Sequence, residues 1–282
     1  MKDRLLVSTI TPVLNRAEYL EECIESVLKQ DYSNVEHVLV DGGSTDGSLD
    51  ILEEYRRRYP KRVRYISEKD RGACDAINKG LRMAKGQILG FLGSDDTYPT
   101  DAISKVIKAF SEYPDVGLIY GNCNIIDGRG QFTHLAYAAD FDREEAIHSY
   151  CAMFSPSMFY KKEVIDKIGY MDWTLHVGDF DLILRASRIF VFQRIDEVLS
   201  NFRMHKGSVT CSRSAVYMYA WENFKVARRY GAKIYGPRAR SLVVTCLTQP
   251  FRPILAPIYH NKVLYPTLSR LIHKVIGGRP PK

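Results

Sequence analysis

The alternation of two kinds of segment over the first 110 residues is the strongest constraint on the fold. Short apolar, β-branched runs predict strands, and segments in which apolar residues recur every three or four positions predict helices. Strands are expected at residues 5–11, 36–40, 63–66 and 88–92, and helices over 20–28, 49–55, 76–84 and 102–110. Such alternation is typical of an α/β domain with a mainly parallel sheet flanked by helices.

Three local signals set the expected ends of these elements. Pro12 is expected to end the first strand, because proline cannot donate a backbone hydrogen bond. Asn15 and Glu18 have the spacing of a capping box, so the first helix should begin just after Asn15. Thr100 is expected to cap the helix over 102–110.

The pattern changes after residue 110. Asp127 and Gly128 lie between apolar runs and have the composition of a hairpin turn, so antiparallel strands should join the sheet. We expect an α/β domain over residues 1–212, with halves at 1–110 and 111–212, and a helical, basic C-terminal extension over 213–282. Within the second half, the expected elements are strands at 158–160 and 189–195 and helices at 161–168 and 180–187.

The net charge of +7 is divided unevenly along the chain. Residues 223–282 contain 12 Lys and Arg and no Asp or Glu, which leaves 28 basic against 33 acidic residues in 1–222. A basic tail on an acidic body favours an anionic partner, either a membrane surface or nucleic acid. The alternatives are a charged face packed on the rest of the chain and a contact between copies.

The six cysteines are scattered, with no Cys-x-x-Cys pair, so the sequence supports neither a zinc site nor a disulfide framework. The N-terminus lacks the apolar core of a signal peptide, and no apolar run approaches the roughly 20 residues of a membrane span. We therefore expect a cytoplasmic protein, with the inner face of the cell membrane as a further option because of the basic tail.

Polar residues follow three expected strands at their carboxyl ends. They form the segments 11–15, 41–46 and 94–96, and in parallel sheets such ends share one edge, where ligands bind. Adjacent carboxylates at Asp95 and Asp96 would repel each other unless a cation such as Mg²⁺ or Mn²⁺ neutralised them. The alternative is a solvated turn. Neither a P-loop nor a Gly-x-Gly-x-x-Gly fingerprint occurs, so the nucleotide site expected here is of another kind.

Several motifs closely resemble the family 2 glycosyltransferases, in order and in spacing, over residues 5 to 210. They are Thr-Pro-Val-Leu-Asn-Arg at 11–16, Val-Asp-Gly-Gly-Ser-Thr-Asp-Gly-Ser at 40–48, Ser-Glu-Lys-Asp-Arg-Gly at 67–72, Asp-Ala-Ile-Asn-Lys-Gly at 75–80 and Gly-Phe-Leu-Gly-Ser-Asp-Asp at 90–96. The resemblance implies a GT-A fold, a nucleotide-diphosphate sugar donor, a divalent metal (Mn²⁺ or Mg²⁺) and inversion at the anomeric carbon.

The resemblance also assigns residues on the donor side. Asp96 would be the metal ligand in a DxD-like element, with Asp95 facing the ribose or the donor sugar. The remaining donor-binding residues would be Pro12, Leu14, Asp41, Asp70, Arg71, Asp75, Asn78 and Ser94. Two positions depart from the family pattern, because many relatives have an acidic residue at Gly42 and an arginine at Ile77.

The second half should supply a base, since the acceptor hydroxyl must lose a proton as it attacks the sugar. The segment around Asp179 resembles the acidic motif of the family, which makes Asp179 the expected base and Asp181 the second choice. The alternative is that Asp179 only caps the following helix. The segment 202–208 resembles one that closes over the diphosphate, so His205 would bind the metal or a phosphate, and Arg203 would neutralise the leaving group.

Taken together, these features predict an inverting, metal-dependent glycosyltransferase that uses a nucleotide-diphosphate sugar, with UDP expected because it is the commonest nucleotide in the family. The acceptor would be a glycan or a lipid-linked glycan in polysaccharide, O-antigen or glycolipid synthesis. The alternatives are a sugar-nucleotide pyrophosphorylase and a non-catalytic protein that binds nucleic acid or membrane through its basic tail. No nucleic acid partner is expected, because carboxylates at the sheet edge would repel phosphates.

Overall fold

The computed structural model describes residues 5–208, 213–239 and 242–243. The basic, proline-containing segment 244–282, on which the membrane hypothesis mainly depends, lies outside the described residues. By contacts between residues the chain forms two compact units. One comprises Met1–Phe141 with Ala152–His205, and the other comprises Asp142–Cys151 with Lys206–Lys282.

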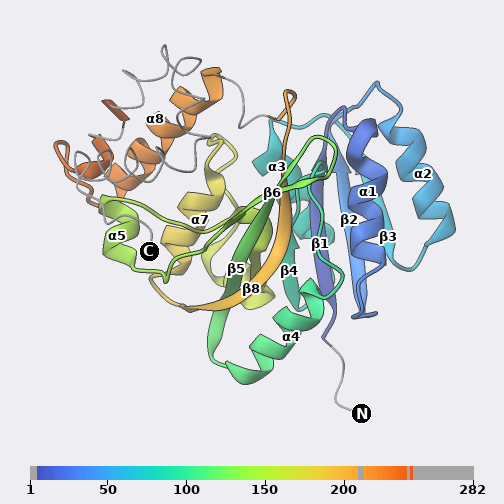
Figure 1. The fold of residues 1–282 in the computed structure, drawn as a ribbon, viewed down its shortest axis with the longest axis horizontal. Coiled ribbons are helices and arrows are strands. Elements are labelled where there is room, and N and C mark those ends of the chain that lie inside the picture. The colour runs from blue at the N-terminus through green and yellow to red at the C-terminus, as the bar shows by residue number, and fades with distance from the viewer. Residues whose placement is uncertain (1–4, 209–212, 240–241, 244–282) are drawn as a thin grey trace. The chain divides into compact units, whose positions relative to one another are not determined.

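The first half of the larger unit is a parallel sheet with helical connections (Figure 1). Its strands pair in the order β3-β2-β1-β4, with every neighbouring pair parallel. The strands are β1 (Val7–Val13), β2 (Val35–Asp41), β3 (Val63–Ser67) and β4 (Ile88–Phe91). The helices are α1 (Ala17–Leu28), α2 (Ser48–Arg58), α3 (Ala73–Met83) and α4 (Ala102–Glu112). The predicted alternation is therefore confirmed.

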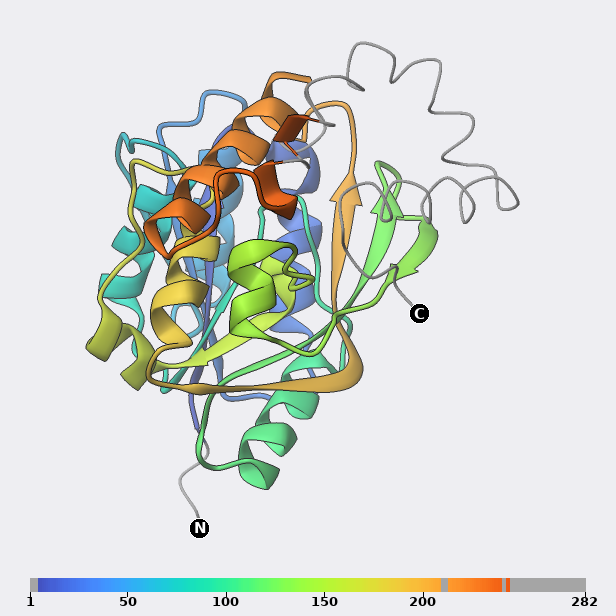
Figure 2. The same ribbon diagram turned by 90° about the vertical axis from the view of Figure 1, so that its left-hand side faces the viewer.

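The second half extends the same sheet with mixed strand directions. The strand β7 pairs antiparallel with β4 and β5, β5 and β6 form the predicted hairpin, and β8 runs parallel to β5. Figures 1 and 2 both show β8 beside the hairpin. These strands are β5 (Val116–Asp127), β6 (Phe132–Ala136), β7 (Met158–Lys161) and β8 (Val191–Met204). The helical elements are η1 (Ser155–Ser157), α6 (Lys162–Ile168) and α7 (Gly178–Ala186).

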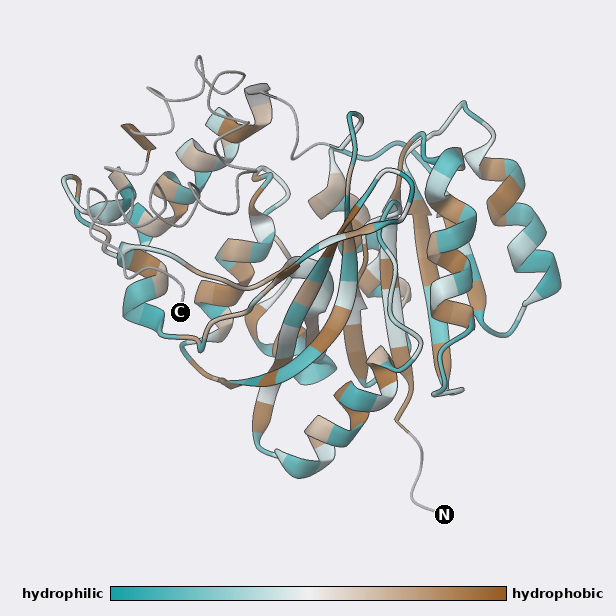
Figure 3. Ribbon diagram, viewed as in Figure 1, coloured by the Kyte–Doolittle hydropathy of each residue, from teal (hydrophilic) through white to brown (hydrophobic). Residues whose placement is uncertain are grey.

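Both faces of the sheet are covered by apolar packing. Every residue of β2 is buried. On one face, Val38 belongs to the same core cluster as Ile10 of β1. On the other face, Leu39 belongs to a cluster with Leu20 and Ile24 of α1. The hydropathy colouring shows hydrophobic and hydrophilic residues alternating along α1 and α2, as in helices with one buried side (Figure 3). A sheet buried on both faces leaves its strand ends as the place for a polar site.

Three expected element ends were wrong. The strand β1 continues through Pro12 to Val13, which is tolerated because pairing with β4 stops at Ile10 and leaves one side of β1 open. Asn15 adopts a positive φ of 52° and does not cap α1; instead, Asp46 Oδ2 accepts a hydrogen bond from Ala17 N. The residue before α4 is Asp101 rather than Thr100, and its side chain makes no capping bond.

In the smaller unit, α5 (Arg143–His148) and α8 (Arg213–Arg229) contact each other. Arg238 donates to the carbonyl groups of Ala146 and Ile147 in α5. Over the described ranges, four cysteines are found without disulfides, at positions 23, 74, 123 and 151. None of the helices described is long and apolar enough to span a membrane.

Candidate active site

The three predicted polar segments meet at one edge of the sheet. Strands β1, β2 and β4 are parallel neighbours, so the segments that follow them leave at the same end. Asn15 N donates to Ser44 Oγ (2.8 Å), and Thr45 N donates to Asn15 Oδ1 (2.9 Å). Arg16 Nε also lies 3.9 Å from Asp95 Oδ2, which brings the third segment to the same place.

Asp41, the last residue of β2, shapes the turn that follows it. Its carboxylate is fully buried and accepts from Gly43 N (2.9 Å), Ser44 N (3.2 Å) and Ser67 Oγ (2.7 Å). These bonds fold the 42–44 backbone around the carboxylate, and Gly43 takes a φ of 97° that favours glycine. On the neighbouring strand Pro12 is half-buried, whereas Leu14 is 50% exposed.

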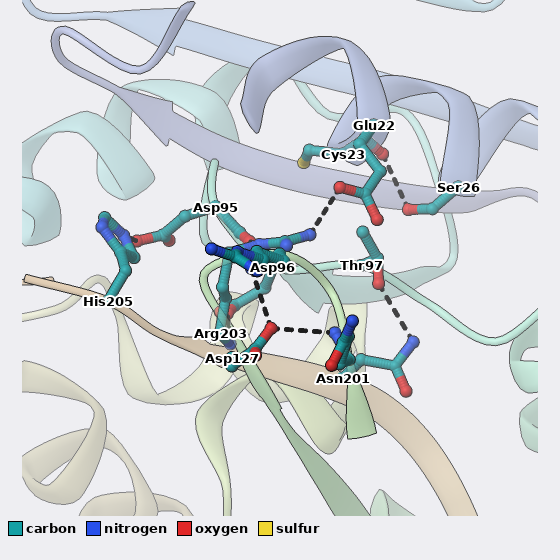
Figure 4. A network of polar contacts seen from close by, with 12 residues as sticks. Glu22, Cys23, Ser26, Asp95, Asp96, Thr97, Asp127, Asn201, Arg203 and His205 are labelled. Carbon is teal, nitrogen blue, oxygen red and sulfur yellow. Dashed lines mark hydrogen bonds and ion pairs between the residues drawn. The ribbon is translucent and has the colours of Figure 1, made fainter. Parts of the chain in front are cut away.

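The segment 94–96 is separated from the end of β4 by two residues and is held by the end of β8 (Figure 4). Ser94 and Asp96 are buried, and Asp96 Oδ1 accepts from Arg203 N over 2.8 Å. Asp95 Oδ2 lies 2.9 Å from His205 Nε2. The predicted elements around Asp96 and His205 are therefore neighbours in space, although 110 residues separate Asp95 from His205.

The electrostatics of this turn suit a cation. Burial, and next the charge of Asp95, raise the pKa of Asp96 to about 8, so at neutral pH the pair resists carrying two negative charges. The described residues include no set of three His, Cys, Asp or Glu side chains arranged for metal binding. The donor chemistry nevertheless fits Mn²⁺ or Mg²⁺, since these cations prefer carboxylate oxygens and two adjacent carboxylates lie where negative charge is unfavourable.

Arg203 is only 2% exposed, and its guanidinium contacts the protein itself. Its Nη2 donates to Glu22 Oε2 (2.6 Å) and its Nε donates to the Asp95 carbonyl (2.7 Å). Its guanidinium also lies 4.9 Å from the ring centre of Tyr19. In this conformation Arg203 braces the Asp95 turn against α1, a role different from the expected contact with a leaving diphosphate.

The segment 70–78 contains four of the predicted donor-binding residues. Asp70 Oδ1 accepts from Gly72 N (2.8 Å), and Asp70 Oδ2 lies 2.4 Å from where a Cβ at Gly42 would be. Asp70 thus fills the space that the acidic residue of many relatives would need. Arg71 forms two hydrogen bonds to the Asp75 carboxylate, which hold the pKa of Asp75 below its usual value.

Asn78 lies further along α3 and is 3% exposed. Both ends of its amide bond to the backbone of Met171, at 2.8 and 2.9 Å. Its amide therefore contacts the segment that precedes the predicted base.

The predicted base lies in the first turn of α7. Asp179 is half-buried, and burial raises its pKa, although hydrogen bonds from Phe180 N and the Ser155 side chain act in the opposite direction. The residue before α7 is Val177, so Asp179 lies inside the first turn of this helix and not at its N-cap. Asp181 is buried and paired with Arg185 (Nε to Oδ2, 2.8 Å), which favours Asp179 over Asp181 as a proton acceptor.

Four residues at this site were not predicted from the sequence. Glu22 and Tyr19 contact Arg203, Trp173 stacks on Arg71, and Ser155 bonds Asp179. Nothing local in the sequence shows that the partner of Glu22 is 181 residues away.

Comparison with known proteins agrees with this geometry. The model of Glycosyl transferase family 2 matches residues 8–169, and the chain belongs to this family. This is the family that the motifs predicted, and membership favours a glycosyltransferase over the pyrophosphorylase and non-catalytic alternatives.

Two relatives illustrate the similarity in sequence. The chain is 30% identical over 200 residues to chondroitin synthase of Escherichia coli, covering 71% of this chain and 29% of that protein. It is 31% identical over 185 residues to the PGL/p-HBAD biosynthesis glycosyltransferase of Mycobacterium bovis, covering 64% of this chain and 69% of the relative. The chain thus spans under a third of the length of the chondroitin synthase.

Solved structures share the GT-A fold. The mannosyltransferase PcManGT from Pyrobaculum calidifontis, in complex with GDP-Man and Mn²⁺, matches with a TM-score of 0.67 and 18% identity over 98% of this chain and 86% of its own. Residues 1–349 of S. aureus TarS, in complex with UDP-GlcNAc, match with a TM-score of 0.60 and 16% identity over 96% and 82%. The predicted fold, a mixed and mainly parallel sheet flanked by helices, is confirmed.

Proposed function

We propose that this glycosyltransferase moves a sugar from a nucleotide-diphosphate donor, with UDP as the nucleotide, to an acceptor hydroxyl with inversion. The observation that carries the proposal is the Asp95–Asp96 turn at the carboxyl edge of the sheet, which Arg203 at the end of β8 and His205 just after it hold in place. A donor site at this edge also agrees with the structural neighbours, which were solved with GDP-Man or UDP-GlcNAc.

A divalent cation, Mn²⁺ or Mg²⁺, fits the same turn. Asp96, Asp95 and His205 would hold it, because burial, and next the charge of Asp95, raise the pKa of Asp96 and so favour a cation beside this pair. When bound, the cation supplies positive charge that stabilises a leaving diphosphate.

Asp179 acts as the general base in this proposal. Its raised pKa makes the carboxylate a stronger proton acceptor than an ordinary aspartate, which suits removal of the acceptor hydroxyl proton. The hydroxyl oxygen then attacks the anomeric carbon while the bond to the nucleoside diphosphate breaks. A single displacement of this kind inverts the configuration at that carbon.

The acceptor is proposed to be a glycan or a lipid-linked glycan in polysaccharide, O-antigen or glycolipid assembly. The relatives support this class of pathway, since one is a chondroitin synthase and another is named for PGL/p-HBAD biosynthesis. The 12 basic and no acidic residues of 223–282 support peripheral contact with anionic lipid at the inner membrane face. In liposome flotation with anionic vesicles, the full chain should float, and a chain ending before residue 244 should not.

Nucleotide release tests the donor and the metal together. We expect one donor from a panel of UDP-, GDP- and dTDP-sugars to release its nucleoside diphosphate with Mn²⁺ or Mg²⁺, and chelator or Asp96→Ala to abolish that release. Asp179→Asn should abolish transfer to acceptor while sparing donor binding. Asp166→Asn is the matched control, because Asp166 is an exposed carboxylate paired with Lys162 on α6. Near-normal transfer by Asp179→Asn would contradict the assigned base.

A further inference from the structure

The side-chain amide of Asn78 bonds twice to the backbone of one residue, Met171. Its Nδ2 donates to the Met171 carbonyl (2.8 Å), and its Oδ1 accepts from Met171 N (2.9 Å). Both residues are buried, at 3% and 4% exposure. The pair joins α3, on the donor side of the site, to the segment that leads into α7 and Asp179.

Other contacts reinforce the same junction between α3 and residues 170–178. The guanidinium of Arg71 lies 3.7 Å from the ring centre of Trp173, and that of Arg82 lies 4.6 Å from the ring centre of Tyr170. The first residue of α7, Gly178, is so close to α3 that a Cβ there would meet Cys74 Sγ at 2.6 Å.

The helix α3 is itself held tightly against the sheet. A Cβ at Gly80 would lie 2.4 Å from Ile10 Cγ2 and 3.4 Å from Val40 Cγ2, so the helix lies against β1 and β2 with no room for a side chain. Just before α3, Asp70 closes on Gly42 in the turn after β2. Because α3 cannot shift over the sheet without breaking this packing, it can fix the distance from the sheet edge to α7.

We propose that Asn78 is a positioning residue for transfer, which sets the place of Asp179 relative to the donor through Met171. This inference rests on the proposed role of Asp179 as the base. It differs from the donor contact that the family resemblance implied for Asn78, because both ends of the amide are engaged with Met171. Misplacement of a reacting group by about 1 Å can cost on the order of 100-fold in rate, so loss of this pair should act on the chemical step.

The first test separates donor binding from transfer. Asn78→Ala should lower kcat for transfer by about 10- to 100-fold and leave the donor dissociation constant within about 2-fold. Asn122→Ala is the matched control, because Asn122 is also 3% exposed and bonds Ala138 N and Asp196 within the sheet. The control should keep its kcat for transfer even where its thermal stability falls as much as that of Asn78→Ala.

The second test reaches the junction without changing Asn78. Gly178→Ala should push α7 away from Cys74 and lower kcat for transfer with donor binding unchanged. Cys74→Ala combined with Gly178→Ala should restore most of kcat, because removing Sγ leaves the Asp172 carbonyl oxygen at 3.3 Å and the Cβ of residue 74 at 3.5 Å as the nearest atoms. Cys74→Ala alone should behave as wild type. If Asn78→Ala does not fold, Gly178→Ala and the double variant still test whether the contact between α3 and α7 sets kcat for transfer.

The outcomes distinguish this inference from the proposed function. If Asp179→Asn retains transfer, the proposed base is wrong, and the positioning role loses its basis. If Asp179→Asn abolishes transfer but Asn78→Ala and Gly178→Ala keep normal kcat, only the positioning role is overturned. An Asn78→Ala variant with weakened donor binding and unchanged kcat would instead make Asn78 a donor-binding residue.

Discussion

The backbone N–H of Arg203 donates to Asp96 Oδ1 over 2.8 Å, although 107 residues separate the two in the chain. This bond joins the end of β8 to the turn after β4. Since the guanidinium of the same arginine contacts Glu22 and the Asp95 carbonyl, one residue ties three segments of the candidate site together. The position of both acidic residues therefore depends on the last strand of the sheet.

Replacing Arg203 by lysine should destabilise the protein. Lysine cannot bond Glu22 and the Asp95 carbonyl together as the planar guanidinium does, and because the arginine is buried while Glu22 is half exposed, the lost hydrogen bonds should cost about 1–3 kcal/mol. Urea unfolding would measure the loss. Arg194→Lys is the control, because Arg194 pairs with the exposed Asp140, and exposed pairs contribute about 0–1 kcal/mol. Equal urea midpoints for Arg203→Lys and Arg194→Lys would mean that the contacts of Arg203 contribute little to the free energy of unfolding.

Asp96 should make the stability of the metal-free protein depend on pH. Its pKa is raised to about 8 in the folded state, so its contribution is fully present below its ordinary pKa of 3.8 and is lost as the pH rises toward 8. With chelator present, wild type should lose stability relative to Asp96→Asn between pH 5 and 8, by on the order of 1 kcal/mol per pH unit. Adding Mn²⁺ should reverse this loss of stability in wild type and leave the stability of Asp96→Asn unchanged. Parallel unfolding curves for the two proteins would contradict the raised pKa.

His37 should give the opposite dependence. It is fully buried on β2 beside Thr11 (Nε2 to Oγ1, 2.8 Å), and burial lowers its pKa from 6.5 to about 3. A lowered pKa means that stability is present above pH 6.5 and is lost as the pH falls toward 3. Between pH 7 and 5, wild type should lose about 2 kcal/mol relative to His37→Gln, measured by chemical unfolding in the same buffer series. A constant difference between the two proteins would show that His37 does not titrate in this way.

The sequence predicted the parallel half of the fold well because its signals are local. Strands such as β2 are short apolar runs, and helices such as α1 repeat their apolar residues with the period of a helix. The common edge for the segments after β1, β2 and β4 followed from parallel pairing alone. These properties need no knowledge of distant contacts.

The features that sequence reasoning missed depend on contacts between distant residues. Asp46 caps α1 from another loop, and Glu22 finds Arg203 across 181 residues. The strand β8 extends to Met204, well past the expected end at residue 195, because its later residues pair with β5 although Asp196 and Glu197 are poor strand formers. The roles of the individual site residues and the domain boundary after residue 212 stay predictions.

The path of the chain between its two units determines where the chain can be shortened. Because Asp142–Cys151 groups with the residues after His205, a chain cut at 205 would keep α5 without α8 and expose Ala146 and Ile147, which are each 1% exposed here. Ala139, just before this segment, donates its backbone N–H to the carbonyl of Ala152, just after it, at 3.1 Å. The two ends of the segment Asp142–Cys151 therefore lie close together. Replacing this segment by a short glycine turn, in a chain that ends at His205, would give a minimal version of the larger unit.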